Sequence, residues 1–115
     1  MFKCVDLFCG AGGLSEGFRQ NGFDILIAND FDTWCEATYK LNHPETEFIS
    51  GKIQDITASQ LLSKLDMVPG ELDCIIGGPP CQAFSVYNHQ RGMQDERSGL
   101  FREYLRLVAG LLPKY

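Results

Sequence analysis

The chain has 115 residues, of which 44% are apolar and 22% charged, and its net charge is −5. This length and composition suit one globular domain or part of one, and no stretch approaches the roughly 18 uninterrupted apolar residues of a membrane-spanning helix. Five cysteines without a CxxC pair predict neither a disulfide framework nor a zinc site. Asp6 interrupts the first apolar run, so we expect no signal peptide.

Strand-like and helix-like segments alternate along the chain. Short β-prone runs predict four strands, over residues 2–8, 23–30, 47–50 and 72–78. Helical patterns predict helices between and after them, over residues 14–21, 32–42, 57–65 and 98–112. Strands that alternate with helices of this length predict an α/β fold, in which a parallel sheet carries helices on both faces.

The ends of these helices carry signals of their own. Gly22 suits the left-handed position past the first helix, the second helix stops before Pro44, and Thr57 or Ser59 can cap the third. Pro113 closes the last helix, and the two residues after it would begin a fifth strand. We therefore expect residues 1–115 to form the N-terminal part of one domain, with a sheet that is incomplete at the C-terminus.

A glycine-rich turn joins the first predicted strand to the first helix. Gly10, Gly12 and Gly13 would let a ligand approach the backbone at the carboxyl end of that strand, where doubly wound folds bind nucleotides. A glycine turn alone fits a purely structural role equally well. Asp30, however, follows Gly13 by 17 residues, close to the spacing at which an acidic residue binds ribose hydroxyls. The spacing predicts an adenosine-containing ligand.

Two further side chains stand near the carboxyl ends of predicted strands. Phe31 would lie against an adenine ring, and Asp55 would accept a hydrogen bond from its exocyclic amine. Taken singly, Phe31 also fits a core position and Asp55 a helix cap. A dinucleotide-dependent oxidoreductase would share all of these features, so they do not identify the ligand by themselves.

The motif GGPPCQAFS, residues 77–85, follows the fourth predicted strand. Its two consecutive prolines end the strand and direct the thiol of Cys81 toward the sheet edge that carries the glycine turn. Cys4, Cys35 and Cys74 instead lie within strand or helix patterns, which favours packing roles. Cys81 is therefore the candidate for chemistry.

Three segments in this order, DLFCGAGGLSEGF, GGPPCQAFS and QRGMQDERSGLF, resemble the opening motifs of the cytosine-5 DNA methyltransferases. The resemblance covers nearly the whole chain and implies the Rossmann-like sheet of methyltransferases that use S-adenosylmethionine. It implies that Cys81 adds to carbon 6 of cytosine, so that carbon 5 can take the methyl group of the cofactor. The implied partner is double-stranded DNA with a flipped cytosine, and no metal ion is implied.

Matched position by position, the resemblance also implies binding residues. Those implied for the cofactor are Phe8, Gly10, Gly12, Asp30, Phe31, Asp55, Ile56, Pro80 and Leu100. Those implied to contact the DNA backbone, or to support the loop after the nucleophile, are Gln82, Ser85 and Arg97. Without the motif, Arg97 would be interpreted as an ordinary solvated charge.

The next motif of the family, a glutamate-asparagine-valine element, has no counterpart in this sequence, and neither has a target-recognition domain. We therefore expect a fragment or split subunit that is inactive alone and takes the missing motifs from elsewhere, for instance from a second polypeptide. A tRNA cytosine-5 methyltransferase and a non-catalytic partner subunit remain as alternatives. The resemblance favours the bacterial cytoplasm, or the nucleus for a eukaryotic protein, and a restriction-modification role.

Overall fold

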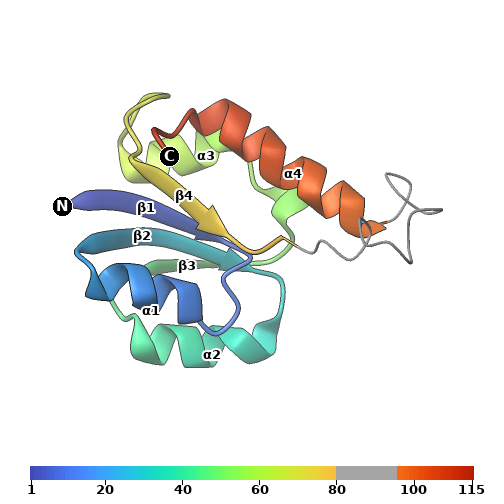
Figure 1. Ribbon diagram of the computed structural model, residues 1–115. Helices are drawn as coiled ribbons and strands as arrows, with labels where there is room; N and C mark the ends of the chain where they lie inside the picture. The colour runs from blue at the N-terminus through green and yellow to red at the C-terminus, as the bar shows by residue number, and fades with distance from the viewer. Residues whose placement is uncertain (80–95) are drawn as a thin grey trace, which may run out of the picture.

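The computed structural model describes residues 1–79 and 96–115, except for the side chains of 96–98. One parallel sheet has the strand order β3-β2-β1-β4, with β1 (Phe2–Leu7), β2 (Phe23–Asp30), β3 (Glu47–Ser50) and β4 (Cys74–Gly77). The helices are α1 (Gly13–Gln20), α2 (Thr33–Asn42), α3 (Ala58–Leu65) and α4 (Glu96–Leu111), with a 3-10 helix η1 (Ile53–Asp55). Helices α1 and α2 cover one face and α3 and α4 the other (Figure 1), which confirms the predicted α/β fold.

The predicted strand and helix boundaries are confirmed to within two residues. Thr57, rather than Ser59, caps α3: its hydroxyl accepts from the N–H of Gln60, and the Gln60 side chain accepts from the N–H of Thr57. Such a reciprocal pair satisfies two of the four N–H groups that a helix start leaves open. The short helix η1 was not predicted, because one turn of three residues leaves no periodic pattern.

The backbone after Pro113 lies beside the start of β4. The N–H of Tyr115 donates to the carbonyl of Asp73 at 2.9 Å, and its carbonyl accepts from the N–H of Ile75 at 3.0 Å. This is the hydrogen-bond pattern of a parallel strand pair. The last residues thus begin to extend the sheet beyond β4, as the sequence predicts.

The larger core cluster lies between the sheet and helices α3 and α4. Its fully buried members come from both layers: Val5, Leu7, Leu61, Leu72, Leu107 and Leu111. A smaller cluster on the other face includes Cys4 and Cys74, which are buried side by side in paired register on β1 and β4. The predicted packing role is confirmed for these two cysteines, whereas Cys35 is only partly buried.

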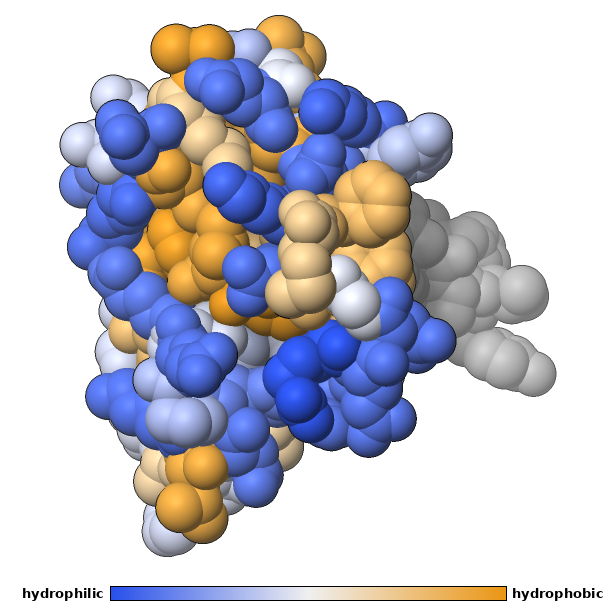
Figure 2. Space-filling model, turned by 90° about the vertical axis from the view of Figure 1, so that its left-hand side faces the viewer, coloured by the Kyte–Doolittle hydropathy of each residue, from blue (hydrophilic) through white to orange (hydrophobic). Residues whose placement is uncertain are grey.

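The two ends of the sheet differ in character. Figure 2 shows the face at which the strands begin, with apolar side chains in its middle and hydrophilic side chains around them. Phe2 at the start of β1 is exposed, and its ring centre lies 5.4 Å from that of Phe23. The glycine turn lies at the opposite end, where the strands finish (Figure 1).

Among the described residues, no helix has the length and apolar character that a membrane crossing requires.

Gly12 is the most tightly enclosed residue of the glycine turn. Its φ is +99°, and a Cβ at this position would lie 2.8 Å from the ring of Tyr39 and 3.0 Å from Nε2 of His43. Both rings are buried and lie against each other, with centres 4.7 Å apart, so neither can move aside. We expect Gly12→Ala to lower the free energy of unfolding by about 2 kcal/mol or more, measured by urea denaturation.

Gly13→Ala is the matched control for this substitution. Among the described residues, a Cβ at Gly13 would meet nothing within 4 Å beyond its chain neighbours and its own helix backbone, and the residue begins α1 with an ordinary backbone conformation. Alanine there should be neutral or should stabilise the helix by up to about 1 kcal/mol. Equal losses at the two glycines would show that close packing against Tyr39 is not what requires Gly12.

Candidate cofactor-binding site

A pocket of about 400 Å³ opens where the strands end. Its lining comes from the ends of β1, β2 and β4, from the segment between β3 and α3, and from α4: Phe8, Asn29, Asp30, Phe31, Lys52, Ile53, Gln54, Gly78 and Leu100. The volume is in the range of pockets that hold small organic ligands, and such pockets lie at this edge in open α/β sheets.

Four of the predicted cofactor residues come together in this pocket: Phe8, Asp30, Phe31 and Leu100. Phe31 is 66% exposed, so the alternative that it is a core residue is wrong and its ring is available to a ligand. Phe8 has a φ of +57°, in the left-handed region that residues other than glycine rarely adopt. Its ring centre lies 6.2 Å from that of Tyr104, so α4 supports this strained residue from behind.

Asp30 connects β2 to the glycine turn. Its Oδ2 accepts a hydrogen bond from the N–H of Gly10 at 2.8 Å, and its Oδ1 accepts from the N–H of Asp32 at 2.7 Å. A carboxylate offers about four lone-pair sites, so each oxygen can accept a second donor. The side chain can therefore hold the turn and still accept hydrogen bonds from a pair of hydroxyl groups.

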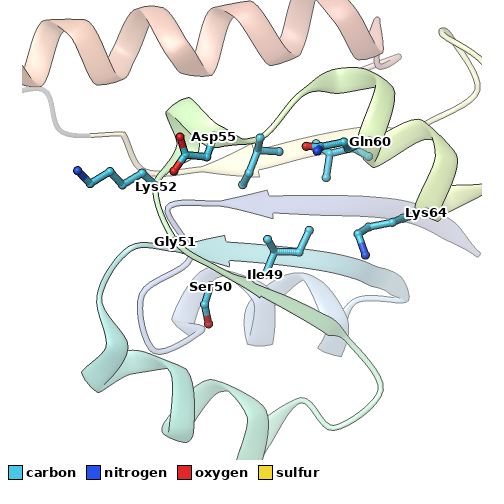
Figure 3. Close-up of a pocket in the computed structure, with 9 residues that line it drawn as sticks. Ile49, Ser50, Gly51, Lys52, Asp55, Gln60 and Lys64 are labelled. Carbon is cyan, nitrogen blue, oxygen red and sulfur yellow. The ribbon is translucent and has the colours of Figure 1, made fainter.

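The structure does not bring Asp55 and Ile56 into this pocket. Both line a second pocket of about 300 Å³ between the end of β3 and α3, together with Gln60 and Lys64 (Figure 3). Ile56 is buried in the larger core cluster. The helix-cap alternative for Asp55 is wrong, because Thr57 caps α3.

The remaining predicted site residues lie outside the described part of the chain: the nucleophile Cys81, and Pro80, Gln82, Ser85 and the side chain of Arg97. The residues that flank this part can be placed. Gly78 before it and Leu100 after it both line the pocket.

A buried hydrogen-bond chain lies beneath the glycine turn. The hydroxyl of Ser15 donates to Oδ2 of Asp6 at 2.5 Å and lies 2.7 Å from the hydroxyl of Tyr39. The Ser15 hydroxyl has one proton, which it donates to Asp6, so the hydroxyl of Tyr39 donates to the oxygen of Ser15. All three residues are fully buried, and they join the strand before the turn to the helix after it and to α2. The sequence signal for this network is a single acidic residue within an apolar strand.

Burial raises the pKa of Asp6 from the usual 3.8 to about 6, with the hydrogen bond from Ser15 opposing the shift and the charge of Asp30 adding to it. A pKa that is higher in the folded state adds stability below pH 4, and this stability is lost as the pH rises through about 6. Asp6→Asn keeps an acceptor for Ser15 but carries no charge at any pH. Between pH 7 and pH 4, we expect the free energy of unfolding of the unmodified chain to rise by about 1–3 kcal/mol more than that of Asp6→Asn. Urea unfolding at four pH values measures the difference, and parallel pH profiles would refute it.

Known proteins resemble this chain over almost its whole length. The model of the family "C-5 cytosine-specific DNA methylase" matches residues 2–115. The Type II methyltransferase M.AgeI of Thalassovita gelatinovora is 46% identical over 112 residues, which are 97% of this chain and 26% of that protein. The Type II methyltransferase M.AquIA of a Picosynechococcus strain is 44% identical over 112 residues, which are 97% of this chain and 45% of that protein.

The solved structures agree with the sequence relatives. A protein described as a DNA modification methyltransferase of an Escherichia coli prophage superposes with a TM-score of 0.81 at 35% identity, over 98% of this chain and 30% of that one. This confirms the predicted methyltransferase sheet. The chain spans between about a quarter and somewhat under half of the length of these relatives. Since the family model matches it from residue 2 to residue 115, the chain belongs to the C-5 cytosine-specific DNA methylase family.

Proposed function

We propose that this chain forms the cofactor-binding and nucleophile-bearing part of an enzyme that methylates carbon 5 of cytosine in DNA, with S-adenosylmethionine as methyl donor. The observation that carries the proposal is the family match over residues 2–115. Because the chain spans only part of its relatives, the complete activity needs further residues. These come either from the same polypeptide or from a second one that supplies the missing motifs.

The residues of the pocket fit an adenosine-containing cofactor. The exposed ring of Phe31 can lie against the adenine, and the carboxylate of Asp30 can accept from the ribose hydroxyls while it holds Gly10. Within the described part of the chain, no atom beyond the neighbours of Gly10 lies within 4 Å of where its Cβ would be, so a ligand can approach this backbone. Bound S-adenosylmethionine would supply an electrophilic methyl group. Phe8 and Leu100 would shield its sulfonium end from water.

We propose Cys81 as the nucleophile, on the strength of its motif and the family match. Its thiolate adds to carbon 6 of cytosine, carbon 5 takes the methyl group, and loss of the carbon 5 proton lets the thiolate leave again. Other cysteines suit this role less. Burial raises the pKa of Cys4 to about 12 and raises that of Cys9 strongly, so neither thiol ionises near neutral pH. Gln82, Ser85 and Arg97 are proposed to contact the DNA backbone or to support the loop.

The proposed substrate is double-stranded DNA from which the target cytosine is flipped into the active site. In this proposal the enzyme acts in the bacterial cytoplasm as the modification partner of a restriction system. The test uses the chain together with the remaining residues of the enzyme, tritiated S-adenosylmethionine, and either duplex DNA or tRNA. Tritium in 5-methylcytosine of the DNA supports the proposal, whereas label in tRNA alone would assign the chain to a tRNA methyltransferase.

A further inference from the structure

Arg106 of α4 reaches the segment that joins β3 to α3. Its Nη2 donates a hydrogen bond to the carbonyl oxygen of Ile53 at 3.0 Å, across 53 positions of the chain. The same oxygen accepts from the N–H of Ile56 at 3.1 Å, and this second bond closes the single turn of η1. The guanidinium group of α4 therefore holds the 3-10 helix at its first residue.

The segment that Arg106 holds borders both pockets. Lys52 lines both of them, Gln54 lines the cofactor pocket, and Asp55 lines the pocket beside α3 (Figure 3). A displacement of η1 would therefore change the shape of the cofactor pocket, even if every side chain that touches the ligand stayed the same.

Other contacts of this segment leave the orientation of η1 to Arg106. From β2, the buried Asn29 donates through Nδ2 to two carbonyl oxygens before η1, at 2.7 and 3.1 Å. Ile53 and Ile56 are buried in the larger core cluster, but burial of apolar surface has no preferred direction. Among the described residues, no side chain other than Arg106 donates to the backbone of η1. A directional bond to η1 thus comes from α4.

Helix α4 contacts the cofactor pocket at two further points. Leu100 lines the pocket directly, and the ring of Tyr104 lies behind that of Phe8, with the ring centres 6.2 Å apart. Together with the bond from Arg106, these contacts connect one helix to the end of β1 and to η1. The position of α4 thus sets the spacing between opposite walls of the pocket.

The ion pair of Arg106 does not by itself account for an arginine here. Its Nε donates to Oε2 of Glu103 at 2.7 Å, and both side chains are partly exposed. Exposed pairs of this kind contribute little to stability. The planar guanidinium can donate from Nε and from Nη2 at once, so one side chain holds its own helix and the carbonyl of Ile53 together.

We infer that Arg106 is a positioning residue of the cofactor site, which keeps the wall formed by η1 in place opposite Phe8 and Leu100; this inference rests on the proposed cofactor. Arg106 does not itself line the pocket that the described residues form. It acts through the carbonyl of Ile53, without a contact to the ligand.

The test is titration of the 115-residue chain with S-adenosylmethionine, at a temperature at which thermal unfolding shows each variant to be folded. Arg106→Met keeps a long apolar side chain but has no donor, and it is expected to weaken binding about tenfold. Arg102→Met is the matched control. Arg102 is an exposed arginine one turn earlier on α4, so its replacement removes the same charge and should leave the affinity unchanged.

Amide hydrogen exchange without ligand separates positioning from a general loss of stability. In Arg106→Met the N–H of Ile56, which shares the carbonyl of Ile53, should exchange about tenfold faster, while the N–H groups of β1 should keep their protection. Unchanged affinity in Arg106→Met, equal weakening in both variants, or weakening without faster exchange at Ile56 would overturn the inference and leave the cofactor proposal in place. Failure of the unmodified chain to bind S-adenosylmethionine would overturn the cofactor proposal and this inference with it.

Discussion

Replacement of Cys81 by serine in the complete enzyme is expected to abolish covalent trapping on DNA that carries 5-fluorocytosine at the target site. After thiolate addition and methyl transfer, fluorine occupies the place of the departing proton, so elimination is blocked and the adduct accumulates. A serine hydroxyl is far less ionised near neutral pH than a cysteine thiol, whose ordinary pKa is about 8.5. Denaturing gel electrophoresis measures the adduct as a protein band shifted by the attached DNA.

Cys74→Ser is the control for this experiment. Cys74 lies buried in β4, so a serine hydroxyl there should lower the stability of the fold. The substitution leaves Cys81 in place, and the folded variant should still form the adduct. The adduct should also require S-adenosylmethionine to reach its trapped form. An adduct that persists without Cys81, or that peptide sequencing locates at Cys9, would show that the proposed mechanism is wrong even though the family assignment stands.

Asp30→Ala is expected to weaken S-adenosylmethionine binding by about 100-fold. The carboxylate would accept charge-assisted hydrogen bonds from two ribose hydroxyls, and each such bond contributes about 1.5–3 kcal/mol. The substitution also releases the N–H of Gly10, so the glycine turn loses its connection to β2. Asp30→Asn keeps one acceptor oxygen and should recover part of the affinity. Isothermal titration calorimetry compares the three proteins.

The control separates cofactor contacts from stability. Asp32 lies two residues further on, and its carboxylate caps α2 by accepting from the N–H of Trp34 at 2.9 Å. Asp32→Ala should therefore cost about 1 kcal/mol of stability, as the loss of a helix cap does, with little change in affinity for the cofactor. If both alanine variants lose affinity to the same extent, Asp30 acts through the stability of the fold and not through the ribose.

The sequence was sufficient to predict the order of strands and helices and the position of the glycine turn. Those features depend on periodic apolar patterns and on glycine, whose signals are local. The strand-end argument brought Asp30 and Phe31 together correctly, because the carboxyl ends of parallel strands meet at one edge, but it also included Asp55, which lines a different pocket. Phe8 was implied only by the family resemblance. The prediction for Cys81 depended on a motif. Such a motif identifies a candidate nucleophile but does not give the position of its side chain.

The side chains around the turn before α3 were not predictable in the same way. In η1 each residue rotates the side chain by about a third of a turn, so a one-residue difference decides whether Gln54 or Asp55 lines the pocket at the ends of the strands. The buried chain of Asp6, Ser15 and Tyr39 escaped prediction for another reason. Its members come from three different elements, and only the folded chain brings them into contact.

Titration of the 115-residue chain with S-adenosylmethionine tests the central claim most directly, because it asks whether this part of the enzyme carries the cofactor site. We predict saturable binding with a dissociation constant in the micromolar range, strongly weakened by Asp30→Ala, and no comparable binding of a nicotinamide dinucleotide. Tight binding of the nicotinamide dinucleotide, or no binding of S-adenosylmethionine by the folded chain, would contradict the account.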